Sequence, residues 1–436
     1  MAPEGKVRPW RRRLALGAAA VALTVIVLPW LLVDVVGGAA NRRPLDLHKQ
    51  LSPAGRALLA QAMDGLDATR RLDFHTHLAG LGTDGSGAWV NPRMMAWTHP
   101  VNRLKFSIYL SAAGVTDLAH ADAQYLARLF DVVRAQSGRG RHVLLAFDYR
   151  YRPDGTRDAE HSEFYVPNDR VIALARQHPD MFVAAGSVHP YRRDALAELD
   201  RLAAAGVRVI KWLPNAQAMD PADPRCDAFY ARMVAHGMVL LTHTGKELAV
   251  EAEEDQDFGN PLRLRRPLDR GVRVVAAHMA SLGDDLDLDH LDAKPEPPRV
   301  ASWRLLLRLF DEQKYVGRLF GEISALTMFS RCKEPLAGVL ARPDLFERLV
   351  DGSDYPLPAV NALYQTRQLA GLGYVTDAEA AALRDIFAFN PLLFDVVLKR
   401  TLRHPQTGAR LPASVFHDRL NLLDPNPQAL QPPPTP

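Results

Sequence analysis

The feature that most restricts the fold of this chain is a series of eight short apolar runs separated by helical patterns. The runs are continuously apolar, which is typical of strands covered on both faces. Strict alternation with helices favours a parallel sheet, and eight strands match an α/β fold, the closed (β/α)₈ TIM barrel. The expected strands are Leu72–His75, Val143–Phe147, Phe182–Ser187, Val207–Trp212, Met238–Thr242, Val272–Ala277, Tyr315–Ile323 and Leu349–Gly352.

An open, doubly wound sheet is the structural alternative to the barrel. Such a sheet favours a glycine-rich phosphate loop after its first strand, and His75-Thr76-His77 stands there instead. We therefore predict one barrel domain over residues 71–421. The helical patterns that support it are Pro53–Leu66 before the barrel and Ala195–Ala205, Asp227–His236 and Ser302–Asp311 within it.

Two long insertions interrupt the alternation. Leu78–Phe106 and Arg150–Pro167 are polar or glycine-rich and follow the first and second strands. Because barrel enzymes carry their sites at the carboxyl ends of the strands, we expect these loops to cap a pocket. Five aromatic residues in or beside them could line it, although ordinary packing is the better interpretation of any single one: Trp89, Trp97, Tyr149, Tyr151 and Tyr165.

The N-terminal segment predicts a membrane anchor. Twenty residues from Leu14 to Val33 contain no Asp, Glu, Lys or Arg, and five basic residues precede them. This length spans a bilayer core, and the charge pattern keeps residues 1–13 in the cytoplasm. We therefore expect a transmembrane signal anchor at 14–36, a linker and lead-in helix at 37–70, and a catalytic domain outside the cytoplasm, in the periplasm of a bacterium.

Other interpretations of this segment remain open. It resembles a signal peptide cut after Ala40, and Arg12-Arg13-Leu14 loosely resembles a twin-arginine signal. A buried hairpin of the barrel is a further alternative. At the other end of the chain, residues 422–436 are rich in proline and are expected to form a disordered tail.

Charge and cysteine content exclude some functions. A net charge of +3 provides no general field for nucleic acid, so we expect no nucleic-acid partner. Cys226 and Cys332 form neither a CxxC motif nor a zinc cluster. They are best interpreted as buried inert thiols, and a disulfide between them cannot be inferred.

The strongest chemical signal lies at the end of the first expected strand. His75 and His77 are two residues apart, so their side chains point to the same face of a strand and can chelate one ion. Transition metals prefer imidazole and carboxylate ligands that converge from several elements. The pair therefore predicts a metal site at the mouth of this strand.

Four more polar residues stand at strand ends and keep the spacing of barrel units. His243 and His278 are 35 residues apart, about one unit, and Asp354 follows His278 by 76 residues, about two units. Lys211 precedes His243 by 32 residues. Each has an ordinary explanation as a packing histidine, a salt-bridge lysine or a helix-capping aspartate. Because all four keep the spacing of barrel units, we expect them to converge on one site. His189 and Glu322 are two further candidates that are left out of the predicted site.

With these residues at these positions, the chain resembles the amidohydrolase superfamily, and most closely its amidohydrolase-related (amidohydrolase 2) branch. The resemblance covers about residues 70–400. The matching motifs are Asp73-Phe74-His75-Thr76-His77, the run Gly206 through Lys211-Trp212-Leu213-Pro214, Thr242-His243-Thr244-Gly245, Ala277-His278, Gly352-Ser353-Asp354-Tyr355-Pro356 and Ile386-Phe387-Ala388-Phe389-Asn390-Pro391.

The resemblance implies a (β/α)₈ barrel that holds one or two divalent ions. His75, His77, His243 and Asp354 would ligate metal. His278 would bind a second ion or orient a water molecule, and Lys211 matches a lysine that some members carbamylate to bridge two metals. Zinc is the first choice, with manganese or iron as alternatives.

The resulting hypothesis is a metal-dependent hydrolase of a small molecule. Metal-activated water would attack an amide, lactone, ester or cyclic imide, with Asp354 as general base and His278 beside the oxyanion. Two alternatives stay open: a non-oxidative decarboxylase with Arg93, Arg103 or Arg150 on the substrate carboxylate, and a membrane-anchored binding barrel without catalysis. The substrate and the oligomeric state are not indicated.

Overall fold

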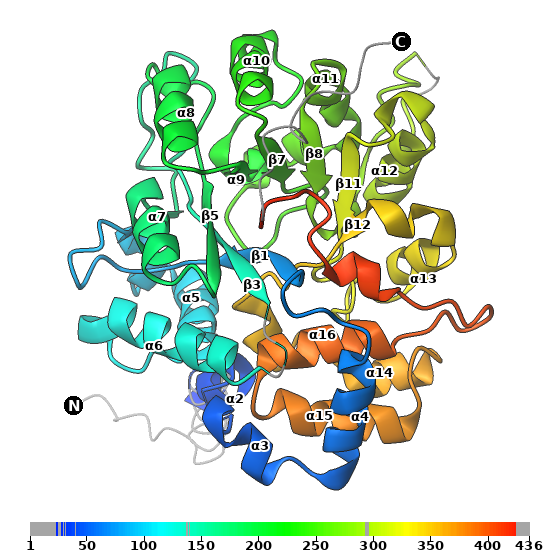
Figure 1. Ribbon diagram of the computed structural model, residues 1–436. Helices are drawn as coiled ribbons and strands as arrows, with labels where there is room; N and C mark the ends of the chain where they lie inside the picture. Colours follow the sequence, from blue (N-terminus) through cyan, green and yellow to red (C-terminus); the bar gives the residue numbers. More distant parts are fainter. Residues whose placement is uncertain are drawn as a thin grey trace, which may run out of the picture.

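Eight parallel strands form the centre of the computed structural model (Figure 1). The structure describes residues 23, 24, 28, 30, 32–39, 41–136, 138, 140–292 and 296–423. Each strand pairs with the next in chain order, which confirms the predicted alternation. The strands are β1 (Leu72–His77), β3 (Arg141–Leu145), β5 (Phe182–Gly186), β6 (Val209–Trp212), β7 (Val239–Thr242), β8 (Arg273–Ala276), β11 (Leu319–Glu322) and β12 (Leu349–Val350).

The sheet closes between its last and first strands. Phe74 N donates to the Asp351 carbonyl oxygen (2.9 Å), and His77 N donates to that of Tyr355 (2.9 Å). Thr76 forms a parallel bridge with Tyr355. These bonds make the sheet a barrel, so the open-sheet alternative is wrong.

The barrel interior is filled by alternate residues of the strands. Val209 of β6 and Val239 and Leu241 of β7 belong to a buried apolar cluster inside the barrel. Side chains two residues apart on a strand point to one face, so this alternation continues to Lys211 and His243 at the carboxyl ends. Ile210 and Trp212 point the other way and pack against the surrounding helices.

Helices surround the sheet, and those at Ala195–Ala204, Asp227–Ala235 and Ser302–Asp311 follow the predicted patterns closely. The lead-in helix α4 begins at Pro53, after Ser52 accepts a hydrogen bond from Gly55 N (3.0 Å). It packs on α15 and α16, far along the chain (Figure 1). The α-helices are α2 (Val33–Gly37), α3 (Leu47–Gln50), α4 (Pro53–Met63), α5 (Pro100–Ala112), α6 (Ala121–Arg134), α7 (Asn168–Gln177), α8 (Ala195–Ala204), α9 (Pro214–Gln217), α10 (Asp227–Ala235), α11 (Arg265–Asp269), α12 (Ser302–Asp311), α13 (Glu334–Leu340), α14 (Thr366–Gly371), α15 (Asp377–Phe387) and α16 (Pro391–Thr401).

Some strand boundaries differ from the expected ones. The run Tyr315–Ile323 becomes a strand only at Leu319, because Gly317 turns the chain at φ +78°. Strand β3 begins at Arg141, where parallel pairing with Leu72 starts. Apolar content alone does not mark these ends, because pairing with the neighbouring strand decides them.

The two insertions meet above the barrel. Strand β2 (Trp89–Val90) from the first pairs antiparallel with β4 (Phe164–Tyr165) from the second. We call these two paired strands, Trp89–Val90 and Phe164–Tyr165, the cap ribbon. Val90 and Phe164 line the pocket below, so the capping role expected of the insertions agrees with the structure. A second hairpin joins β9 (Asp284–Leu286) to β10 (Arg299–Ala301).

The predicted membrane anchor requires correction. Across the residues that the structure describes, none of the helices combines the length and apolar composition needed to cross a bilayer. Most of the run from Leu14 to Val33 lies outside the described residues. Its end continues into the five-residue helix α2, where Asp34 accepts a hydrogen bond from Ser111 of α5 (3.1 Å). The membrane-anchored, extracytoplasmic localisation and the membrane partner are contradicted by this finding and are withdrawn.

Two smaller expectations concern the cysteines and the tail. Cys226 and Cys332 are both buried and free, which agrees with their interpretation as inert thiols. Most of the predicted tail, from residue 424 onward, lies outside the described residues, as do the basic residues of 1–13.

Candidate active site

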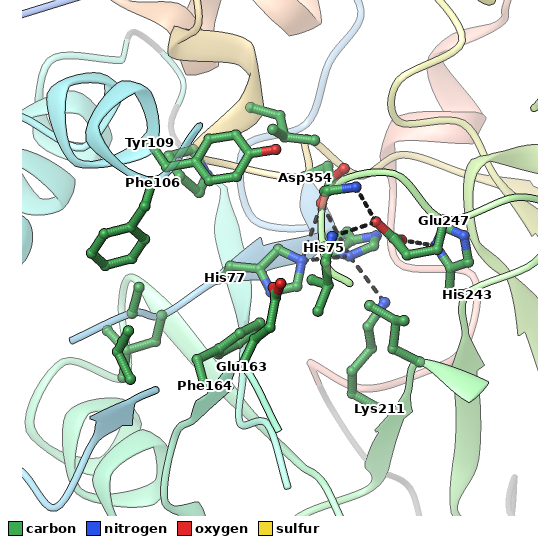
Figure 2. Close-up of a pocket in the computed structure, with 18 of the residues that line it drawn as sticks. His75, His77, Phe106, Tyr109, Glu163, Phe164, Lys211, His243, Glu247 and Asp354 are labelled. Atoms are coloured by element: carbon green, nitrogen blue, oxygen red, sulfur yellow. Dashed lines mark hydrogen bonds and ion pairs between the residues drawn. The ribbon is translucent and has the colours of Figure 1, made fainter. Parts of the chain in front are cut away.

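The carboxyl ends of five strands bring the six candidate residues together. His75, His77, Lys211, His243, His278 and Asp354 all line one pocket of about 980 Å³, part of it open to solvent. Figure 2 shows the labelled members of this set around one point at the pocket floor. Residues separated by up to 279 positions in the sequence therefore share one site.

Three potential ligand atoms lie within contact distance of each other. His75 Nε2 is 3.2 Å from His77 Nε2, and Asp354 Oδ1 is 3.4 Å and 3.1 Å from these two nitrogens. Ligands at zinc–nitrogen distances of about 2.0–2.1 Å are separated by roughly 3 Å, so the spacing fits one shared ion. His75 Nδ1 donates to Glu322 Oε2 (3.1 Å), which leaves a lone pair on Nε2 for such an ion.

The other two histidines are held in a comparable way. His243 Nδ1 faces Glu247 Oε2 at 3.3 Å, and its buried Nε2 has no hydrogen-bond partner among the described residues. His278 Nδ1 donates to Ser324 Oγ (2.7 Å), so its Nε2, 3.9 Å from Asp354 Oδ2, carries the lone pair. A buried, unpaired imidazole nitrogen is costly unless a ligand completes it. The donor set therefore suits a divalent transition metal.

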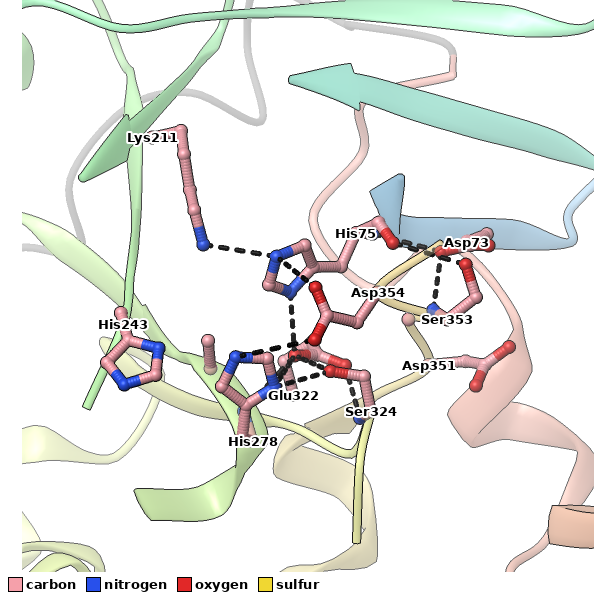
Figure 3. Close-up of polar contacts among 12 residues, drawn as sticks. Asp73, His75, Lys211, His243, His278, Glu322, Ser324, Asp351, Ser353 and Asp354 are labelled. Atoms are coloured by element: carbon pink, nitrogen blue, oxygen red, sulfur yellow. Dashed lines mark hydrogen bonds and ion pairs between the residues drawn. The ribbon is translucent and has the colours of Figure 1, made fainter. Parts of the chain in front are cut away.

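Glu322 connects two of these histidines from below the pocket (Figure 3). Its fully buried carboxylate accepts from His75 Nδ1, from His278 N (3.2 Å) and from Ser324 Oγ (2.8 Å). Burial raises the pKa of Glu322 to about 7, against the opposing effects of Lys399 and Ser324. The Glu322 carboxylate therefore holds the His75 ring directly and the His278 ring through Ser324.

Replacing Glu322 by glutamine should weaken metal binding by about 10- to 100-fold, the usual cost of losing a carboxylate that orients a histidine ligand. The amide offers only one acceptor oxygen and directs an N–H group toward His75 or Ser324. Titration against a chromophoric chelator measures this affinity without any substrate. Glu334→Gln, at an exposed position paired with Arg304, is the control. An E322Q protein with the wild-type metal affinity would contradict the positioning role.

Lys211 lies on the same floor. Its Nζ is 3.1 Å from His75 Nε2, and burial lowers its pKa to about 8 although Asp354 and Glu322 act in the opposite direction. A lysine with a lowered pKa has more of the neutral amine that carbamylation needs. Whether the lysine carries a carbamate stays a prediction.

The backbone is strained at two of the candidate residues. His278 and Asp354 both adopt left-handed conformations, with φ of 58° and 60°. Such conformations cost about 1–3 kcal/mol for residues other than glycine and tend to persist where function requires them. Asp354 N donates to the His75 carbonyl oxygen (2.7 Å), which fixes this turn against the first strand.

The aromatic residues of the insertions follow the ordinary packing interpretation. None of the five lines the pocket, and Tyr149 stacks on Tyr165 and packs against the tilted ring of Trp89. The pocket aromatics are Phe106, Tyr109 and Phe164. His189 is buried outside the pocket, where Nε2 donates to the Gln217 carbonyl oxygen (2.8 Å).

Sequence reasoning missed Glu247 and Ser324 and did not commit to Glu322. Glu247 follows His243 by four residues, a spacing that offered a weak signal for a partner. Glu322 gave only its place at the end of a strand, and Ser324 gave no signal, since only closure of the barrel brings them to His75 and His278.

The sequence model of the amidohydrolase family (Amidohydro_2) matches residues 72–392. The chain belongs to the amidohydrolase family. Members of this family are metal-dependent enzymes, among them hydrolases and decarboxylases. The matched range holds the whole candidate site of this amidohydrolase. Among curated proteins, none matches the chain.

Three of the solved structures that the chain resembles are as follows. An uncharacterised TIM-barrel protein from Bordetella bronchiseptica is 19% identical (71% of this chain and 93% of that chain covered, TM-score 0.44). A candidate 2-pyrone-4,6-dicarboxylic acid hydrolase from Pseudomonas putida is 16% identical (73% and 97%, 0.41). A 5-carboxyvanillate decarboxylase mutant from Novosphingobium aromaticivorans, with bound manganese and 3-methoxy-4-hydroxy-5-nitrobenzoic acid, is 14% identical (74% and 94%, 0.40).

Proposed function

We propose that this amidohydrolase is a metal-dependent hydrolase that cleaves a carbonyl-centred bond of a small molecule: an amide, lactone, ester or cyclic imide. The observation that carries the proposal is the cluster of His75 Nε2, His77 Nε2 and Asp354 Oδ1, 3.1–3.4 Å apart at the floor of an apolar pocket. The lone pair of His278 Nε2 faces the free oxygen of Asp354.

The proposed ligands are His75, His77, His243 and Asp354. Lys211 and His278 would join them if a second ion is present. Zinc is the first candidate because imidazole and carboxylate ligands suit it, and manganese and iron are alternatives. When bound, the ion lowers the pKa of a coordinated water and polarises the substrate carbonyl.

In the proposed chemistry, Asp354 is the general base. Asp354 Oδ1 faces the clustered histidine nitrogens, and Asp354 Oδ2 faces His278 Nε2. A water that lies between Oδ2 and His278 Nε2 would therefore be within reach of Oδ2. Asp354 takes the proton of this water as it attacks and returns it to the leaving group. The proposed transfer therefore involves only the Asp354 carboxylate, the water and the leaving group.

His278 is proposed to orient the water. Burial is the main cause that lowers the pKa of His278 well below its usual value, and the nearby His243 adds to this effect. The lowered pKa favours the neutral ring. With Nδ1–H donated to Ser324, neutral His278 offers Nε2 as an acceptor. An acceptor nitrogen can orient a water by accepting one of its O–H groups, but it cannot donate a hydrogen bond to the oxyanion. The water-orienting role is therefore preferred.

Hydrolysis is preferred to decarboxylation because the pocket lining offers no arginine for a substrate carboxylate. The arginines considered for that role have other partners in the structure. Arg93 pairs with Glu251 (2.9 Å), Arg150 pairs with Asp255 (2.8 Å), and Arg103 lies over the Trp97 ring. A non-catalytic barrel is disfavoured because every expected ligand position holds a metal-binding side chain or a lysine.

The test is turnover of a panel of lactones, aryl esters and cyclic imides in ¹⁸O-labelled water. We expect one ¹⁸O atom in the carboxyl product and no release of CO₂. Release of CO₂ from aromatic acids, with no turnover of any carbonyl substrate, would replace hydrolysis by decarboxylation.

A further inference from the structure

The wall of the pocket differs chemically from its floor. Above the metal-binding side chains, the lining is largely apolar and includes Val90, Met94, Phe106, Phe164 and Leu213. Two polar side chains of the wall come from the capping segments and not from the barrel strands: Glu163 beside the cap ribbon and Tyr109 on α5 (Figure 2). A small number of polar groups in an apolar pocket usually fixes the orientation of a ligand.

Glu163 is held rigidly in this wall. It is only 6% exposed and directly precedes β4. Its carbonyl oxygen accepts from Asn91 N (2.7 Å), and the Asn91 side chain donates to the Ser162 carbonyl oxygen (2.9 Å). The nearby cation Arg93 pairs with Glu251 instead of Glu163. The carboxyl group thus lines the pocket without an arginine partner.

The wall presents one ionisable carboxyl group and one phenol hydroxyl to the pocket. Burial raises the pKa of Glu163 to about 7, although Lys105 and a backbone hydrogen bond from Glu251 act in the opposite direction. Burial also raises the pKa of Tyr109, and the carboxylates of Glu247, Glu163 and Asp354 add to the effect. Tyr109 lines the pocket, so its hydroxyl is within reach of a ligand.

Lys211 is the only lysine or arginine among the residues that line the described pocket, and it lies at the floor beside His75. A carboxylate on the substrate body would therefore meet apolar side chains and Glu163, whereas Lys105 and Arg93, whose charges act on Glu163, lie outside the pocket lining. Burying such an unpaired charge next to a like charge is unfavourable.

We propose that the pocket selects a small apolar substrate that has no carboxylate and that presents an amino or hydroxyl group to Glu163. Glu163 is the specificity-determining residue, and the Tyr109 hydroxyl is a second hydrogen-bonding point. This inference rests on the proposed function, because it places the scissile carbonyl at the histidine cluster and the donor group at the wall.

The experiment uses three benzohydroxamic acids and the zinc-loaded full-length protein. All three share the metal-chelating head, and they differ in the 4-substituent: aminomethyl, ethyl or carboxymethyl. We expect the aminomethyl compound to bind at least about tenfold more tightly than the carboxymethyl compound, a difference of ~1.4 kcal/mol. Isothermal titration calorimetry measures each Kd without any turnover.

Substitutions then assign the preference to Glu163. Glu163→Gln should reduce the ratio of the two Kd values to within about threefold, since like-charge repulsion is removed. Glu163→Ala is a second variant in case the glutamine protein does not fold. Glu160→Gln is the matched control, because this exposed acid lies in the same insertion as Glu163 and does not line the pocket. It should keep the wild-type ratio.

The outcomes separate this inference from the proposed function. A Glu163-dependent preference without ¹⁸O incorporation would support the substrate class and overturn hydrolysis. Hydrolysis with equal or tighter binding of the carboxymethyl compound would overturn the substrate class alone. Wild-type ratios in both Glu163 variants, or failure of all three compounds to bind, would also overturn the substrate class.

Discussion

Replacing Asp354 by asparagine should lower kcat by about 10³-fold, within the range of roughly 10²–10⁴ attributed to a positioned general base. Asparagine keeps the shape of the side chain, and an amide cannot take a proton from water at neutral pH. The fold should survive, because asparagine retains the backbone N–H that donates to the His75 carbonyl oxygen and fixes this turn.

The measurement pairs steady-state turnover with metal analysis of the same D354N sample. Metal content is needed because Asp354 is also a proposed ligand, so loss of the ion and loss of the base would otherwise look alike. Asp223→Asn, outside the pocket, is the control for a change of charge. Undiminished turnover of D354N with metal bound would contradict the role of the carboxylate.

Removing the metal with a chelator should reduce turnover by about 10³-fold, since an ion in such a site stabilises the transition state by several kcal/mol. Without it, the Nε2 lone pairs of His75 and His77 and the Asp354 carboxylate face one another at 3.1–3.4 Å. Adding Zn²⁺ or Mn²⁺ should restore activity and raise the melting temperature, because a ligand that binds only the folded state stabilises it.

His77→Ala provides the comparison for this experiment. It removes one of the three clustered ligand atoms and leaves the Glu322 network of His75 and His278 intact. We expect this variant to recover little activity at metal concentrations that restore the wild type. Full activity of the chelated wild type, after metal analysis shows that the ion is gone, would remove metal from the mechanism.

Local sequence patterns were sufficient for the strands and for most of the candidate site. Continuous apolar runs indicated buried parallel strands, and one-unit spacing placed Lys211 and His243 at the ends of neighbouring strands. Whole-unit spacing then predicted that His278 and Asp354 would meet His75. These inferences succeeded because they depend on periodicity within a strand and on repetition of one barrel unit.

Other inferences failed where a pattern has more than one structural meaning. An uncharged apolar run indicated an anchor, but no described helix can cross a bilayer, and α2 packs on α5 instead. The aromatic residues of the insertions were correctly placed in capping segments. None of the five lines the pocket, and their placement depends on the pairing of β2 with β4, which composition does not reveal.

The sequence by itself determined the barrel, the histidine pair at the end of the first strand and the spacing of the other polar strand ends, because each follows from short-range periodicity. Only the tertiary structure decided how the site is held and what it admits. Glu322 lies 247 residues from His75, and Glu163 reaches the pocket through the pairing of two insertions. Such contacts depend on closure of the barrel and on burial, which no local pattern encodes.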